Sequence, residues 1–312
     1  MGAAGRAHRA ADEHQGGLMA VRARQWLVPM APALLLLGLF VAGPVLWSFY
    51  VSFTNAALTG AAATDPEFVG LENFRRLFSD PALWHSAWLT VVFTVGSAVI
   101  GQNCLGMLIA VLTQHRNRWL RAGVGTVVVS AWVLPELVAA FAVYAFLNSE
   151  GTLNNLLVAV GLEPRDWLYS VPMLAVILGN VWRGTAFSML VYQASLSEVP
   201  SDLVEAAEMD GAGPFRRFWH VTLPIIRRSV LTNLMLITLQ TIGLFTLIYV
   251  LTAGGPNAAT QTLPLLMYDS AFEFHEIGYG ATISLVLLLI GGLFAAVYAK
   301  SLGDPDSRGD GA

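Results

Sequence analysis

The sequence predicts an all-α integral membrane protein, and three observations carry the prediction. Of the 312 residues, 55% are hydrophobic and 12% are charged, against roughly 25% charged in an average soluble domain. Long apolar stretches occur six times, each near the roughly 20 residues that a membrane-spanning helix needs. These stretches lack the alternation of polar and apolar residues that a membrane β-barrel requires. The mild net charge of −4 gives no sign of nucleic-acid binding.

The six apolar stretches divide the chain into a membrane domain and two short tails. Residues 1–20 are rich in Gly, Ala and charge and have no apolar period, so they are predicted to be a disordered tail. The apolar run that follows is longer than the roughly 7–15 residues of a signal peptide core, which favours a retained span. The membrane domain covers 21–303, and 304–312 form a second tail. The predicted spans are about 26–50, 86–112, 122–147, 170–193, 229–251 and 279–302.

The distribution of positive charge gives the direction of the spans. If the amino terminus lies inside, 13 of the 17 Lys and Arg residues fall in inner segments and three, Arg75, Arg76 and Arg165, in outer ones. Arg183 lies within a span. Positive residues accumulate in cytoplasmic loops. The sequence therefore predicts a multi-pass protein of the cell membrane with both termini in the cytoplasm.

The outer loop at 253–278 contains no Lys or Arg and is acidic. Its apolar segment "LPLLMYDSAFEF" is too short to span, which predicts a surface or re-entrant helix. His275 and Glu276 lack a second His at zinc-helix spacing, so no metal site is expected. Cys104, the one cysteine, lies in an apolar run and is expected to be a buried, inert thiol.

A polar segment, 194–228, interrupts the apolar pattern on the cytoplasmic side. Pro200 and Ser201 begin a predicted helix, with Asp202 and Glu205 spaced as in a capping box. Gly211 is expected to end this helix, and a second short helix is predicted from Pro214 to Pro224. Two interpretations fit these residues: an amphipathic hairpin on the lipid surface, or a helix that docks its apolar face into a groove on a soluble partner.

The polar segment resembles the EAA loop of binding-protein-dependent ABC importer permeases. The matching residues are Glu205, Ala206, Ala207, Gly211, Val221, Leu223 and Pro224. Two further stretches, "VGLENFRRLF" and "LTAGGPNAATQTLPLLMYDSAF", resemble the carbohydrate subfamily, of the maltose and glycerol-phosphate type. One departure is Phe245-Thr246, where many relatives have Phe-Asp, so no role of that Asp is carried over.

The resemblance implies a type I ABC importer permease with six transmembrane helices, in the plasma membrane of a prokaryote. In that family the EAA loop docks into an ATP-binding subunit and transmits ATP-driven closure. It also implies a second homologous permease subunit and an extracytoplasmic solute-binding protein as partners. The chain has no Gly-rich ATP-binding motif, so ATP and Mg are expected on the ATP-binding subunit, and this chain is expected to bind no cofactor. The implied coupling residues are Glu205, Ala206, Ala207, Asp210, Gly211, Leu223 and Pro224.

Several polar residues within the spans share one predicted depth. Trp132, Arg183 and Gln240 each lie about ten residues from the cytoplasmic end of a span, which corresponds to about 15 Å. An aromatic ring with polar neighbours suits a sugar, although polar residues in spans also tie helices together. The resemblance implies that the positions of these polar residues line the sugar site, as the matching positions do in maltose-type permeases. Glu136 is added to the predicted pathway because a charged residue within a span usually faces the protein interior or a water-filled route. The predicted substrate pathway is Trp132, Glu136, Asn180, Arg183, Gly184, Gln240, Thr241 and Leu244.

Two further expectations concern polar residues near this pathway. Glu136 and Arg183 are predicted to lie close enough to offset each other's burial cost. Gln102 and Asn103 in the second span are assigned to helix packing.

The sequence therefore favours a permease subunit that imports a sugar or oligosaccharide. Import of glycerol phosphate or another polyol by the same machinery is the alternative. A secondary transporter is disfavoured, because such carriers often use acids within the spans as proton relays and only Glu136 qualifies here. A membrane enzyme is disfavoured because no Ser/His/Asp or paired-carboxylate arrangement is present.

Overall fold

The computed structural model describes residues 29–114 and 116–302, and all regular structure within them is helical. The chain divides into two units at residues 51 and 52. The described part of the first unit is one helix, Pro29–Val51, with a π-helical turn at Gly38–Ala42 followed by α2, Gly43–Val51. Its side chains are almost all exposed. The first predicted span is therefore helical from residue 29, and residues 26–28 lie outside the described residues.

The second unit begins with short outer elements and then the second span. α3 is Ala61–Thr64 and α4 is Glu72–Ser79. The second span runs unbroken for 34 residues from Pro81 to Gln114, through α5 (Pro81–Thr94), the π-helical segment η2 (Val95–Gln102) and α6 (Asn103–Gln114). It begins at Pro81 because the side chain of Asp80 accepts a hydrogen bond from the amide of Ala82, 2.8 Å away, in the manner of a helix N-cap.

The third predicted span is two helices, which corrects the expectation of one continuous helix. α7 is Arg118–Val133 and α8 is Glu136–Leu147, and the chain direction turns by 107° between them. Pro135 lacks an N–H, and the residue before a proline is pushed out of the α conformation. Leu134 accordingly has an extended ψ of 136°. α9 (Thr152–Ala159) and α10 (Trp167–Ser170) follow.

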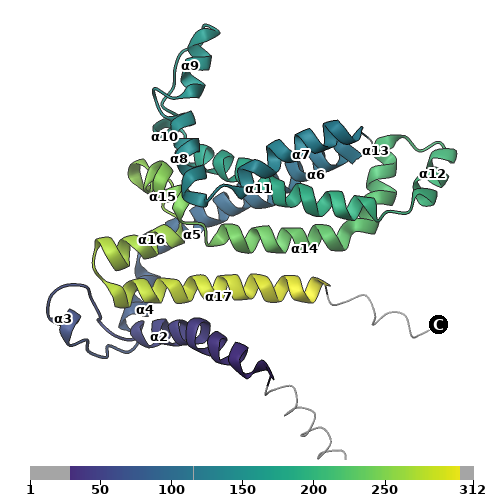
Figure 1. Ribbon diagram of the computed structural model, residues 1–312. Helices are drawn as coiled ribbons and strands as arrows, with labels where there is room; N and C mark the ends of the chain where they lie inside the picture. Colours follow the sequence, from purple (N-terminus) through teal and green to yellow (C-terminus); the bar gives the residue numbers. More distant parts are fainter. Residues whose placement is uncertain (1–28, 115, 303–312) are drawn as a thin grey trace, which may run out of the picture. The chain divides into compact units, whose positions relative to one another are not determined.

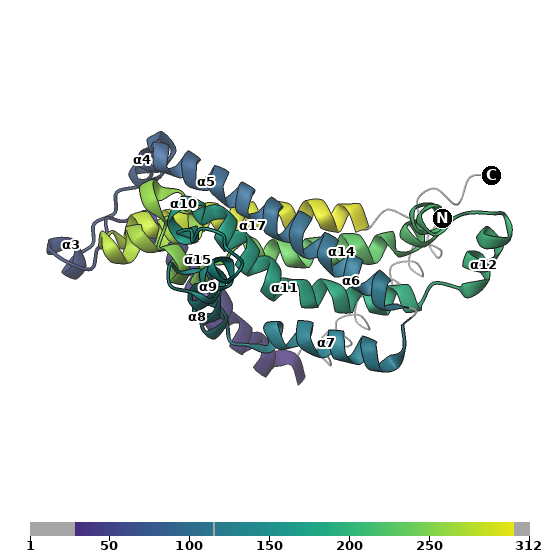
Figure 2. The same cartoon turned by 90° about the horizontal axis from the view of Figure 1, so that it is seen from above.

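The fourth and sixth predicted spans are long, unbroken helices. α11 is Pro172–Ser197 and α17 is Ile277–Leu302, each of 26 residues. α11 packs on η2, α6, α7 and α14, and it runs beside α14 in both views (Figures 1 and 2). Gly106 on α6 permits close contact, because a Cβ there would lie 2.5 Å from the Cβ of Ser188 on α11.

The fifth predicted span is also broken, contrary to the sequence prediction. α14 (Leu223–Ile242) ends at Gly243, and a new helix, α15 (Thr246–Thr252), begins after Phe245. The outer segment that follows contains the short turn η4 (Pro256–Ala258), α16 (Leu263–Tyr268) and the π-helical η5 (Asp269–Glu273). Leu263, Leu265 and Leu266 are buried. The apolar residues of this segment are therefore packed within the chain, and the surface and re-entrant placements both stay predictions.

The polar segment 194–228 forms a helix, a turn and a second helix that continues into the fifth span. α12 is Ser201–Met209 and α13 is Pro214–Arg217, followed by the π-helical η3 (Phe218–Thr222) and then α14. The expected end at Pro224 is wrong. The wide π-helical turn accommodates a proline that would clash in a regular helix. Figures 1 and 2 place α12 and α13 at the end of α11 and α14 opposite α15.

Candidate functional site: a polar cavity between broken helices

A small cavity of about 40 Å³ lies among the second span, α7, α11 and α14, well below the roughly 300–1,000 Å³ typical of closed ligand pockets. Seven of the eight predicted pathway residues line it. The lining residues are Gln102, Trp132, Asn180, Arg183, Gly184, Phe187, Ile237, Gln240, Thr241 and Leu244.

The two helix breaks explain why these residues meet. Trp132 is in the last turn of α7, just before the break at Leu134 and Pro135. Thr241 is in the last turn of α14, and Leu244 lies in the break that follows. Backbone groups freed by a break at membrane depth are tolerated where they line a cavity. α7 and α14 thus bring their ends to the cavity, while the unbroken α11 passes beside it.

Two of the polar side chains in the cavity wall, those of Asn180 and Gln102, form hydrogen bonds between helices. Asn180 donates from Nδ2 to Oγ of Ser97, 2.9 Å away, and Gln102 donates from Nε2 to the carbonyl oxygen of Asn180, 3.2 Å away. Both side chains are buried, so both tie the second span to α11. The assignment of Gln102 to packing therefore matches its hydrogen bond, although Gln102 also lines the cavity.

The Gln102 side chain lies against Gly184 and fills the space that a side chain would occupy there. A Cβ at Gly184 would lie 2.3 Å from Cδ of Gln102, far inside van der Waals contact. A larger residue at this position of α11 would force the Gln102 amide to move from its place in the cavity wall. Trp132 and Phe187 form the aromatic part of the wall, with ring centroids 6.1 Å apart and planes tilted by 38°.

Arg183 is the one charged residue in the cavity wall as the structure describes it. Its Nε is buried without a hydrogen-bond acceptor. The two ion pairs found among the described residues, Arg76–Glu276 and Arg217–Glu208, do not include it.

Glu136 is absent from the described cavity wall, and the predicted pair between Glu136 and Arg183 is not formed. Glu136 is the first residue of α8, beyond the 107° turn. The turn at Pro135 separates Glu136 from the path that a continuous third span would have followed.

A second cluster of polar side chains lies between the cavity and α12. We call it the inner network, and its members are Asn103, Ser188, Tyr192 and Asn233. Nδ2 of Asn233 on α14 is 3.0 Å from Oγ of Ser188, 3.0 Å from the hydroxyl of Tyr192 and 3.2 Å from Oδ1 of Asn103. The Tyr192 hydroxyl also donates to Asn103. The network joins α6, α11 and α14, in agreement with the packing role predicted for Asn103. Asn233 and Tyr192 were not singled out in the sequence, where a single Asn and a Tyr in apolar runs gave no signal.

The turn after α12 has the geometry that the glycine signal predicted. Gly211 has a positive φ of 78°, and its amide donates to the carbonyl of Glu208 at 2.9 Å. The amide of Ala212 donates to the carbonyl of Ala207 at 3.0 Å. This pair of bonds is a Schellman motif. An ion pair between Glu208 and Arg217 closes the hairpin, and the sequence gave no indication of it.

The expected capping box at the start of α12 is not formed. The N-cap is Pro200, which has no side-chain acceptor, and Ser201 instead donates to the carboxylate of Asp202. Of the predicted coupling residues, Glu205, Ala206, Asp210 and Gly211 are exposed, while Ala207 is partly buried. Leu223 and Pro224 begin α14.

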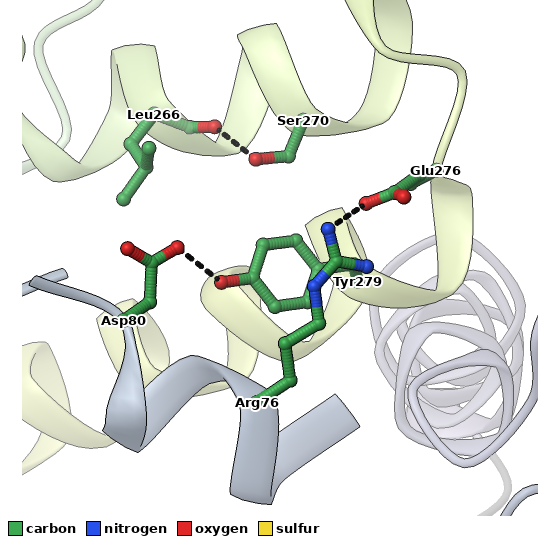
Figure 3. Close-up of polar contacts among 6 residues, drawn as sticks. All are labelled: Arg76, Asp80, Leu266, Ser270, Glu276 and Tyr279. Atoms are coloured by element: carbon green, nitrogen blue, oxygen red, sulfur yellow. Dashed lines mark hydrogen bonds and ion pairs between the residues drawn. The ribbon is translucent and has the colours of Figure 1, made fainter. Parts of the chain in front are cut away.

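Polar contacts join α4 to the start of α17 (Figure 3). Nη2 of Arg76 lies 2.8 Å from Oε2 of Glu276, and its guanidinium carbon lies 4.3 Å from the centroid of the Tyr279 ring. The hydrogen bond to Glu276 raises the pKa of Arg76, against a smaller opposing effect of burial. The Tyr279 hydroxyl donates to Oδ2 of Asp80 at 3.0 Å. These contacts hold the start of the second span against the sixth.

The fold, with helices broken around a polar cavity and a helical hairpin at one end, defines a membrane component of a solute transport system. The chain belongs to the family of binding-protein-dependent transport system inner membrane components, whose family model matches residues 102–302. This confirms the family that the EAA loop indicated.

Relatives with known names match most of the chain. A sulfoquinovosyl glycerol transport system permease of Agrobacterium fabrum is 31% identical over 89% of this chain and 90% of its own length. A trehalose/maltose transport system permease of Thermococcus litoralis is 32% identical over 86% of this chain and 90% of its own.

A solved structure confirms the fold. A chain of a bacterial alginate ABC transporter, determined with an alginate-bound periplasmic protein, matches with a TM-score of 0.74 at 18% identity, over 88% of this chain and 93% of that one. The family and the relatives make the protein an ABC importer permease. Within the described residues, five helices are long and apolar enough to cross a membrane, or six if the bent pair 118–133 and 136–159 is one span.

Proposed function

We propose that this chain forms the membrane pathway for a sugar or oligosaccharide in an ATP-driven importer. The observation that carries the proposal is the cavity, where Trp132 meets a set of polar side chains at the ends of two broken helices. An aromatic face covers the apolar side of a sugar ring, and polar groups such as Gln240 and Thr241 hydrogen-bond its hydroxyls. Permeases named for sulfoquinovosyl glycerol and for trehalose and maltose are among the relatives.

The exposed hairpin α12–α13 is the proposed docking site for an ATP-binding subunit. Met209 and Phe215 are 88% and 76% exposed, and apolar side chains on a short helix suit a groove on a partner. α13 continues through η3 into α14 without a break. A displacement of the hairpin would therefore move the α14 end that carries Gln240 and Thr241.

The remaining parts of the proposed assembly follow from the family. A second, homologous permease would face the cavity, and an extracytoplasmic solute-binding protein would deliver the substrate at the α15–α16 end. ATP and Mg would be used by the ATP-binding subunits. In this arrangement both termini and α12 lie in the cytoplasm of a prokaryotic cell.

A phosphorylated polyol such as glycerol phosphate is the second candidate substrate, because the cavity contains the cation Arg183. A sugar is preferred because a glycerol chain has no flat ring to stack on Trp132.

The test of the sugar pathway is uptake of radiolabelled glycosides in a strain that lacks this subunit and carries plasmid-borne variants. Trp132→Ala should reduce uptake about fivefold or more, since stacking on an aromatic ring is worth on the order of 1 kcal/mol or more. Trp132→Phe, which keeps a flat ring, should retain most of the uptake. Equal loss in both variants would show that the ring is needed for packing against Phe187 and not for a sugar.

The docking proposal has its own test. Glu205→Lys should reduce co-purification of the ATP-binding subunit, and the matched control is Glu163→Lys in the exposed outer segment. Unchanged co-purification in Glu205→Lys, together with normal uptake, would refute the docking role.

A further inference from the structure

Arg183 places a positive charge in the cavity for which the chain provides no counter-ion. No hydrogen bond or ion pair joins its side chain to any residue that the structure describes, and its Nε is fully buried. The other lining residues are neutral. Glu136, the one acidic residue in the predicted spans, lies beyond the bend and outside the cavity wall.

An unpaired cation within a membrane protein is costly and is normally paired or functional. The neighbouring amides do not relieve this cost: their nitrogens donate to Ser97 and to the Asn180 carbonyl, and neither amide oxygen accepts a hydrogen bond from Arg183 in the described chain. Arg183 therefore keeps its donors free beside the aromatic wall formed by Trp132 and Phe187.

The chemistry of the Arg183 guanidinium group indicates which ligand groups it can bind in the cavity. Its planar set of N–H donors matches the oxygens of a carboxylate, sulfonate or phosphate and binds them in pairs. The rest of the cavity offers a ring-stacking surface and neutral hydrogen-bonding groups. We propose that the substrate is a sugar that carries an oxyanion group, and that this group pairs with Arg183 in the cavity. The inference rests on the proposed function and narrows it from sugars in general to acidic sugars.

The first experiment compares matched sugars with the wild-type transporter in cells. Three pairs of radiolabelled probes differ in charge: methyl glucoside with methyl glucuronide, methyl galactoside with methyl galacturonide, and glucosyl glycerol with sulfoquinovosyl glycerol. We expect uptake of at least one acidic probe with little uptake of its neutral partner. Preference for the neutral member of every transported pair would overturn the inference and leave the proposed function intact. Uptake of none of the six probes would contradict the proposed function itself.

The second experiment assigns the preference to Arg183. The readout is the ratio of acidic to neutral uptake in the transported pair, which does not depend on the amount of assembled complex. Arg183→Gln should lower this ratio roughly tenfold or more, because a hydrogen bond to a charged group is worth at least about one decade in affinity. Arg183→Lys, which keeps the charge, should retain part of the preference and provides a second variant if Arg183→Gln does not fold.

The matched control is Arg75→Gln, which removes the same charge from an exposed position on α4, and it should leave the ratio unchanged. If Arg183→Gln also leaves the ratio unchanged, the counter-ion of Arg183 belongs to another subunit and the inference is wrong.

Discussion

Gly106→Ala tests how closely the second span must approach α11. A Cβ at Gly106 would lie 2.5 Å from Cβ of Ser188 and 2.9 Å from the backbone nitrogen of Met189. Ordinary contact begins near 3.4 Å, so α6 and α11 would have to separate by roughly 1 Å. Neither obstacle is the flexible end of a side chain. Overpacking of this kind costs typically about 1–3 kcal/mol.

The separation would also act on the inner network. Asn103 lies on α6; its bond to Tyr192 crosses the interface with α11, and its bond to Asn233 joins α6 to α14. Interhelical hydrogen bonds in membrane proteins average about 0.6 kcal/mol, so their weakening adds less than the overpacking. We expect the free energy of unfolding to fall by about 1–3 kcal/mol in total. At roughly 3 °C per kcal/mol for a chain of this size, Tm should fall by about 3–9 °C.

The assay is thermal unfolding of the purified protein in detergent, with Gly125→Ala on α7 as the matched control. Nothing lies within 4 Å of a Cβ at Gly125, and Ala favours a helix over Gly by about 1 kcal/mol. The control should therefore keep or raise Tm while Gly106→Ala lowers it. Equal Tm changes in the two variants would refute the close contact between α6 and α11.

Two further predictions concern the hairpin and the outer segment. Gly211 has φ 78° whereas Gly213 has φ −66°, so Gly211→Ala should destabilise the hairpin by about 1–2 kcal/mol and Gly213→Ala should not. Limited proteolysis within 200–214 measures this, and equal cleavage of both variants would contradict it. Burial raises the pKa of Asp269, and the hydrogen bond from Gln261 only partly opposes this. The folded state therefore holds a proton that the unfolded state releases, and stability is lost as pH rises from about 4 through the raised pKa. Asp269→Asn should remove this loss, so that its Tm advantage over wild type is greater at pH 7 than at pH 4; a smaller advantage at pH 7 would reverse the sign of the argument.

The sequence is sufficient for the class, for the four unbroken spans and for the turn of the hairpin, because each depends on local chemistry. Apolar length predicts a helix that fits the bilayer whatever its neighbours are. The turn at Gly211 needs a positive φ that glycine adopts freely, and α12 ends there as predicted. The depth of a polar residue follows from its distance along a helix, which is why Trp132, Arg183 and Gln240 meet at one cavity.

The sequence predictions were wrong where the effect of a proline depends on the surrounding chain, and where interacting residues lie far apart in the sequence. Pro135 was visible in the sequence, but only the structure shows that it turns the chain by 107° and carries Glu136 away from Arg183. Pro224 was expected to end a helix, and a preceding π-helical turn accommodates it.

Tertiary structure alone decided which polar side chains within the spans have hydrogen-bond partners and which have none in the described chain. Asn180 is bonded across 83 positions of sequence to Ser97, and Asn233 across 130 positions to Asn103, while Arg183 is left without a partner in the described chain. No pattern along the sequence contains that information. Hydrogen-bond satisfaction depends on atoms within about 3 Å, and helix packing, not residue order, brings those atoms together.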